Sequence, residues 1–277
     1  MRAVIYSTVP AAIAGLDAAA RSVGIEPVAV ITPRAARDAQ ATARRNAILG
    51  GAPEGLDLCF AAGRESLERL TRAYDPEIGL CTGYPWRLPP EVLAIPRLGV
   101  VNTHPSRLPR RRGPYPFAWA IRDGDADIWL TVHLMDEHFD TGPILAQGSR
   151  PMPDDTSMDG LGPTLGEIAA EILPQALRRV LAGEPGEAQT DEGATYAGPF
   201  GDDYAVLDAA RPRRELARQV RAWAWMFGQP VEGPLADVAG RRVRVLAASL
   251  DDPGDPAVPR LDAADGPLWL TAVEDAG

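Results

Sequence analysis

An asparagine and a histidine stand one residue apart in the stretch VNTHPSRLP, residues 101–109, which follows a short apolar run. Side chains at positions i and i+2 of an extended segment point to the same face, so we expect Asn102 and His104 to face a common pocket. An amide and an imidazole there could donate hydrogen bonds and move a proton. Taken alone, the pair is more typical of a turn with a capping Asn and a solvated His, so the rest of the chain has to decide.

Length, charge and cysteine usage limit the class of protein. The chain has 277 residues, of which 45% are hydrophobic, so it can bury a real core as one large domain or a large one plus a small one. A net charge of −10 gives no general attraction to nucleic acid. Two cysteines, Cys59 and Cys81, indicate neither a disulfide framework nor a zinc site. No apolar run is long enough to span a bilayer, and we expect a cytoplasmic protein without a membrane partner.

The elements that must position the pair follow from the pattern of the first 183 residues. Apolar runs typical of strands alternate with helical patterns, which predicts an α/β fold with an open, mostly parallel sheet and helices on both faces. The expected strands are residues 2–7, 27–32, 56–61, 77–83, 98–104, 127–135 and 142–151, and the expected helices are about 9–23, 35–47, 64–74, 115–124 and 157–182. Ligands of such sheets bind beyond the carboxyl ends of the strands, where Asn102 and His104 fall.

A change in composition after about residue 184 predicts a second domain. Residues 184–203 are rich in Gly, acidic and small residues, which is typical of a linker. A helix at about 211–223 and strand-like runs at 241–250 and 267–273 follow. We therefore expect a catalytic domain over 1–183, a linker over 184–203 and a small domain over 204–277, of α+β or β-barrel type.

Nucleotide-binding motifs are missing from the sequence. The first strand runs into STVPAAIAG, which lacks the G-x-G-x-x-G pattern, and a chain without lysine cannot carry a P-loop. A dinucleotide-dependent or P-loop enzyme is therefore not expected.

Nearly the whole chain resembles a known family. The stretches YPWRLPPEVLAIPRLGVVNTHPSRLPRRRG, GDADIWLTVHLMDEHFDTGPIL and QTDEGATYAG resemble the formyltransferases that use 10-formyltetrahydrofolate, and most closely their methionyl-tRNA formyltransferase branch. The ordered spacing is specific: Asn-x-His-x-Ser, Leu-Pro, Arg-Gly and, 36 residues after His104, Asp140 in Asp-x-Gly. The resemblance implies a Rossmann-like formyltransferase fold, an OB-like C-terminal domain, 10-formyltetrahydrofolate as co-substrate and no metal.

The resemblance implies that Asn102, His104 and Asp140 are the catalytic residues. Attack of an amine on a formyl carbon gathers negative charge on the formyl oxygen, and donors placed there stabilise it. The Asn102 amide and a protonated His104 are the expected donors. Asp140 is expected to raise the pKa of His104 and to help relay a proton from the amine to the leaving nitrogen.

Similarity also places the folate pocket and the acceptor side. One wall is expected at Trp86, Arg87 and Leu88, although relatives usually have an aliphatic pair at the first two positions. The other wall is expected at Met135, Asp136 and Glu137. An arginine-rich loop follows His104 and is either an exposed charged loop or an anion site. We assign substrate contacts to Ser106, Arg107, Arg112 and Gly113.

The charge of the chain bears on which substrate accepts the formyl group. Relatives that formylate tRNA carry a long basic insertion after the second strand, whereas residues 33–53 read as a plain helix with few basic residues. Residues 202–277 contain 13 Asp and Glu against nine Arg, a net charge of −4 that suits a phosphate backbone poorly. We therefore expect a small amine acceptor, such as an amino sugar, a hydroxyornithine or a natural-product intermediate. The alternatives are methionyl-tRNA formylation, hydrolysis of the formyl-folate and a non-catalytic folate-binding module, and a homodimer is left open.

Overall fold

A computed structural model describes residues 1–34, 39–226 and 233–276 of the chain. The chain forms two compact units, each made of several stretches of sequence. The first unit comprises residues 1–112, 128–151 and 162–195, and the second comprises residues 113–127, 152–161 and 196–277. The expected boundaries near residues 183 and 204 stay a prediction, and the compact units follow a different, interleaved division.

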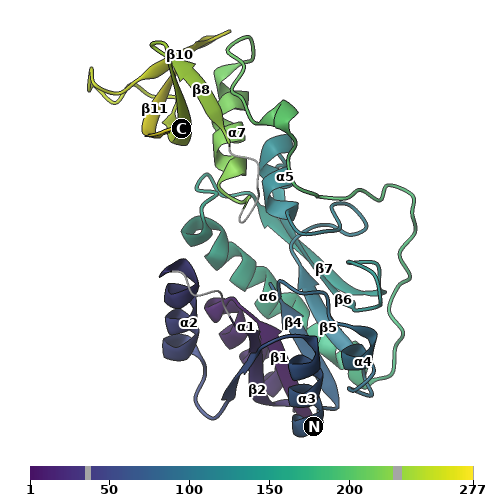
Figure 1. Ribbon diagram of the computed structural model, residues 1–277. Helices are drawn as coiled ribbons and strands as arrows, with labels where there is room; N and C mark the ends of the chain where they lie inside the picture. Colours follow the sequence, from purple (N-terminus) through teal and green to yellow (C-terminus); the bar gives the residue numbers. More distant parts are fainter. Residues whose placement is uncertain (35–38, 227–232, 277) are drawn as a thin grey trace. The chain divides into compact units, whose positions relative to one another are not determined.

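A seven-stranded sheet forms the centre of the first unit (Figure 1). Its strand order is β3-β2-β1-β4-β5-β6-β7. The strands from β3 to β5 pair in parallel, and β6 runs antiparallel to β5. The strands are β1 (Arg2–Ser7), β2 (Glu26–Pro33), β3 (Asp57–Ala61), β4 (Ile78–Thr82), β5 (Val100–His104), β6 (Asp127–Leu134) and β7 (Ile144–Pro151). The predicted open, mostly parallel sheet is thereby confirmed.

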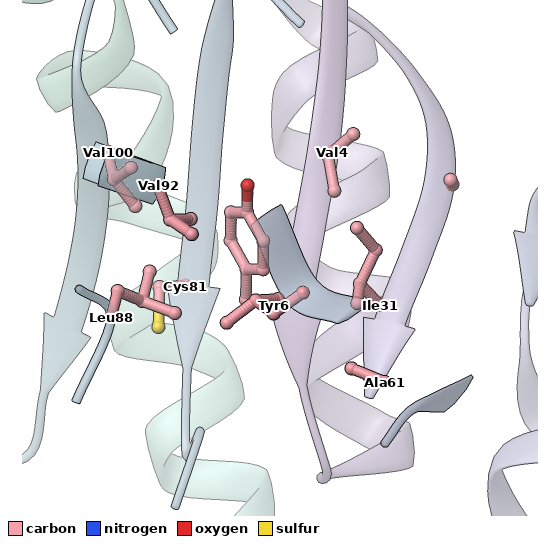
Figure 2. Packing of buried hydrophobic residues seen from close by; sticks show 10 residues of the cluster. Val4, Tyr6, Ile31, Ala61, Cys81, Leu88, Val92 and Val100 are labelled. Carbon is pink, nitrogen blue, oxygen red and sulfur yellow. The ribbon is translucent and has the colours of Figure 1, made fainter. Parts of the chain in front are cut away.

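Helices cover both faces of this sheet, as the alternating pattern predicts. They are α1 (Pro10–Ser22), α2 (Ala39–Gly51), α3 (Arg64–Tyr74), α4 (Pro90–Leu93) and α6 (Met158–Leu181). On one face, Leu67 of α3 and Val92 of α4 belong to one buried cluster with Val4, Tyr6 and Val100 of the sheet. Figure 2 shows Val92 and Val100 beside Tyr6 of β1. Residues 35–38, where we expect the second helix to begin, lie outside the described residues.

The second unit contains an antiparallel sheet and two longer helices. The sheet has the order β10-β11-β9-β8, and its edge strands β10 and β8 approach each other, so it curls like a small barrel. Its strands are β8 (Leu235–Val238), β9 (Arg241–Ser249), β10 (Arg260–Ala263) and β11 (Gly266–Asp275), and its helices are α5 (Pro116–Asp123), α7 (Arg213–Trp223) and the short 3-10 helix η1 (Asp202–Tyr204). Leu216 and Val220 of α7 pack on Val243, Val245 and Leu268 of the sheet.

The short elements are those that the sequence pattern does not reveal. Helix α4 and strands β8 and β10 have four residues each, too few for a hydrophobic period to show. Among the described residues, no helix combines the length and apolar character that crossing a membrane requires.

Candidate active site

The carboxyl end of β5 carries the Asn-x-His pair. Asn102 and His104 both lie within the strand and are buried, with 9% and 5% of their surfaces exposed. The register of β5 against antiparallel β6 puts His133 directly opposite Asn102. Asn102 Nδ2 lies 3.1 Å from His133 Nε2, so the strand pairing adds a second histidine to the predicted site.

The hydrogen bonds of His133 define its tautomer. His133 Nδ1 lies 2.8 Å from the carbonyl oxygen of Leu134, which can only accept, so the proton of the neutral ring sits on Nδ1. Nε2 then accepts a hydrogen bond from the Asn102 amide nitrogen. His133 is thus a hydrogen-bonded support for Asn102. One N–H of Asn102 is used in this contact, and its second N–H remains for another acceptor.

Asp140 reaches the two histidines from the loop between β6 and β7. Its Oδ1 lies 3.5 Å from His104 Nδ1 and 3.6 Å from His133 Nε2, and its side chain is 12% exposed. The glycine of the Asp-x-Gly pattern, Gly142, is required for a steric reason. A Cβ on Gly142 would overlap the carbonyl oxygen of Leu134 and lie 2.9 Å from its carbonyl carbon. Only glycine lets this loop lie against the end of β6.

The surroundings of His104 act on its pKa in opposite directions. Its Nε2 lies 2.8 Å from the carbonyl oxygen of Arg111 and therefore donates to it. Burial lowers the pKa of His104 below its ordinary value; Asp140 and the Arg111 carbonyl raise that pKa but do not outweigh burial. Burial therefore opposes the charged form of His104 that we expect, and its protonation by Asp140 stays a prediction. In the neutral ring, Nδ1 carries no proton and faces Asp140.

A buried hydrogen-bond network holds the loop after His104. Thr131 Oγ1 donates to Ser106 O at 2.6 Å and accepts from Leu108 N at 3.3 Å. Gln147 Nε2 donates to Leu108 O at 3.0 Å and to Thr131 Oγ1 at 2.8 Å. These contacts hold the backbone of the Ser-Arg-Leu-Pro stretch, residues 106–109, against β6 and β7. Neither Thr131 nor Gln147 is part of the motif that the sequence offers.

The side chains expected to contact substrate already have partners in the protein. Ser106 is buried and donates to Arg110 O at 2.8 Å. The Arg107 guanidinium lies 4.7 Å from the centre of the Trp129 ring. Arg112 donates to Gln189 Oε1 from Nε and Nη2, at 3.1 and 3.0 Å. Their assignment to substrate stays a prediction, and the arrangement gives each of them a structural role.

Gly113 is the first residue of the second unit. Its φ of +102° lies in the region that favours glycine, and a Cβ there would meet the Tyr196 ring at 2.6 Å. The conformation and the close ring explain the glycine without a ligand, and its expected contact with substrate stays a prediction.

The two expected walls of the folate pocket meet at one hydrogen bond. Arg87 Nη1 donates to the carbonyl oxygen of Glu137 at 3.3 Å. Trp86 and Met135 are half-buried and pack against the same core cluster. Leu88 is 1% exposed and belongs to that core, so its side chain has no surface left for a ligand.

Asp136 stabilises the second wall internally. Its carboxylate accepts from His138 N at 3.0 Å and from Thr141 Oγ1 at 2.7 Å. The loop therefore presents backbone groups rather than this side chain. In the part of the chain that the structure describes, no group of three or more His, Cys, Asp or Glu could hold a metal ion.

Comparisons with known proteins agree with this arrangement. A family model described as "Formyl transferase" matches residues 11–177. A methionyl-tRNA formyltransferase from Halorhodospira halophila (strain DSM 244 / SL1) is 37% identical over 258 residues, which cover 89% of this chain and 79% of that protein. Enzymes of the same name from Pseudomonas paraeruginosa (strain DSM 24068 / PA7) and Roseiflexus sp. (strain RS-1) are 39% and 36% identical, over 64% and 72% of this chain. The match spans 56% and 61% of their lengths, less than two thirds.

Solved structures with the same fold are more distant in sequence. HypX from Aquifex aeolicus in complex with tetrahydrofolic acid is 18% identical with a TM-score of 0.69, covering 100% of this chain and 44% of that chain. WlaRD, a sugar 3N-formyl transferase solved in the presence of dTDP and 5-N-formyl-THF, is 14% identical with a TM-score of 0.62, covering 100% of this chain and 99% of that chain. At these identities the likeness shows the fold alone.

Proposed function

Because the chain belongs to the formyltransferase family and is an N-formyltransferase that uses 10-formyltetrahydrofolate, we propose that it formylates the amino group of methionine carried by tRNA. The cluster of Asn102, His104, His133 and Asp140 carries the proposal of formyl transfer. The 37% identity over 89% of the chain supports this acceptor over the small amine that composition favours.

Asn102 is the group best placed to stabilise the developing charge. As the acceptor nitrogen bonds to the formyl carbon, negative charge grows on the formyl oxygen. The second N–H of Asn102 Nδ2 would donate to this oxygen, while the first is held by His133 Nε2. Such a preorganised donor typically contributes about 3–4 kcal/mol to transition-state stabilisation.

His104 and Asp140 would hold the proton that the amine loses. A neutral His104 can accept a proton at Nδ1, and the imidazolium that results faces the Asp140 carboxylate at 3.5 Å. Burial opposes a charged His104 in the free protein, but a negative oxygen nearby would offset that cost during the reaction. When the bond to the leaving nitrogen breaks, the same proton can pass to that nitrogen.

The residues around the site suit a folate-type donor, which supplies the activated formyl group. Trp86 and Met135 offer apolar surface on the two walls, and Arg87 joins the walls through Glu137 O. Exposed backbone of the loop 135–140 would bind the polar edge of a ring, since the Asp136 carboxylate is engaged within the loop. These contacts are part of the proposal.

A small amine is the second candidate, because ion pairs neutralise the arginines on the C-terminal sheet. Arg242 pairs with Asp237 at 2.8 Å and Arg260 with Asp262 at 3.2 Å. Arg241 and Arg244 pair with Asp275 and Glu274. Such pairs leave little positive potential for a phosphate backbone.

Parallel assays with 10-formyltetrahydrofolate decide the acceptor. The purified protein is offered methionine-charged initiator tRNA in one series and amino sugars and hydroxyornithine in the other, and N-formyl product is measured. We expect formylmethionyl-tRNA. Product only from a small amine would replace tRNA as the acceptor. Formate release that needs no amine would indicate hydrolysis, and folate binding without turnover would indicate a binding module.

A further inference from the structure

Residues 187–195, which we call the strap, are hydrogen-bonded to both loops of the candidate site. Glu187 and Ile144 exchange two backbone hydrogen bonds, each 2.8 Å long. Thr195 Oγ1 accepts from Arg111 N at 2.8 Å, and Thr195 O accepts from Arg112 N at 2.9 Å. Composition predicts a linker here, yet these contacts make the strap part of the catalytic unit.

Gln189 connects the strap to the Asp140 loop. Its Nε2 donates to Asp140 O at 2.9 Å and to Gly142 O at 2.8 Å. Its Oε1 accepts from Nε and Nη2 of Arg112. Arg112 has only donors, so it determines which end of the Gln189 amide faces the two carbonyls.

The backbone conformation of Asp140 has to be held by contacts such as the hydrogen bond from Gln189. Its φ of +57° lies in the left-handed region, which is uncommon for residues other than glycine and persists where surrounding contacts hold it. Gly142 lies against Leu134, and the Gln189 amide binds the carbonyl oxygens of Asp140 and Gly142. The Asp140 carboxylate depends on this backbone for its place beside His104 and His133.

We propose that Gln189 is a positioning residue for Asp140 and that Arg112 acts through Gln189 rather than on the substrate. The kinetic part of this proposal rests on the proposed formyl transfer. The structural part does not, because it concerns only where the Asp140 carboxylate lies.

Steady-state kinetics of Gln189→Met, which keeps the chain length and removes the amide, test the kinetic part. A displacement of about 1 Å in a catalytic group can cost 10²-fold in rate, so we expect kcat to fall by about 10- to 100-fold with little change in KM for the folate. Arg112→Met should lower kcat in the same direction. Glu192→Gln, a substitution of an exposed strap residue, is the matched control and should leave kcat unchanged.

A double variant separates positioning from a general structural role. If Gln189 acts through Asp140, adding Gln189→Met to Asp140→Asn should cost less than about threefold in kcat. Fully additive losses would overturn the proposal, and so would a normal kcat in Gln189→Met. Gln189→Glu keeps an acceptor for Arg112 and removes the donors to the loop, so it decides the question if the Met variant does not fold.

Histidine NMR titration tests the structural part without turnover. The chain has three histidines, and the Glu192→Gln protein serves as the control. The charged or titratable groups around His104 are Asp140 and His133. The Cys81 thiol also lies near Asp140, but it adds no charge, because burial, and then Asp140, raise its pKa to about 12. Since Asp140 raises the pKa of His104, that pKa should fall further in Gln189→Met and stay unchanged in Glu192→Gln. An unaltered His104 titration would overturn the proposal. Wild-type protein that transfers no formyl group would instead refute the proposed function alone.

Discussion

Replacing Gly142 by alanine should disable the site although every predicted catalytic residue is retained. The added Cβ would overlap Leu134 O and lie 3.4 Å from Asp136 N, all of them backbone atoms that cannot rotate away. Relieving the overlap requires the loop to move by more than about 1 Å, since carbon atoms in contact lie ~3.5 Å or more from their neighbours. Asp140 is two residues away, and a shift of this size should lower kcat by about 10²-fold.

The measurement combines formyl-transfer kinetics with urea unfolding. Overpacking at Gly142 should also lower the free energy of unfolding by about 1–3 kcal/mol, so activity is measured well below the unfolding midpoint. Gly166→Ala is the control, because Gly166 lies in α6 with nothing within 4 Å of the added Cβ. That change should leave kcat unaltered and stabilise the protein by about 0.5–1 kcal/mol. A Gly142→Ala enzyme with a kcat within about twofold of wild type would refute the steric reasoning.

Three further outcomes follow from the site. Asn102→Ala should lower kcat by about 10²–10³ with folate binding largely intact, as measured by equilibrium binding, because the donor acts in the transition state. The double variant His104→Ala with Asp140→Asn should have a kcat only a little below that of the worse single variant. Additive losses of kcat would show that the two residues act independently. Because burial depresses the pKa of His104, the unfolded chain binds its proton first as the pH falls below about 6.5, so this histidine reduces stability in acid. Urea unfolding of His104→Gln should therefore show a smaller loss of stability between about pH 7 and 5 than wild type.

Local sequence patterns predict the order of the main elements and bring together the residues of the candidate site. Apolar runs and helical periods are local patterns, and they predict β1 to β7 and the longer helices within a few residues. The spacing of Asn102, His104 and Asp140 carries the family resemblance, and the contact of Asp140 with His104 agrees with it. From β1 to β5 the parallel order follows because each strand is joined to the next by a helical segment, whereas β6 runs antiparallel to β5 although α5 precedes it.

Contacts between residues far apart in the sequence depend on the tertiary structure and leave no local pattern. Strand register set His133 against Asn102, since pairing depends on which residues of β5 and β6 face each other across the sheet. The same applies to Gln189, whose contacts span more than 45 residues of sequence and whose neighbours look like a linker. Helix α5 joins α7 in the second unit because burying an apolar face depends on nearness in space. Burial by residues distant in sequence likewise lowers the pKa of His104 more than Asp140 raises it, which no local pattern indicates.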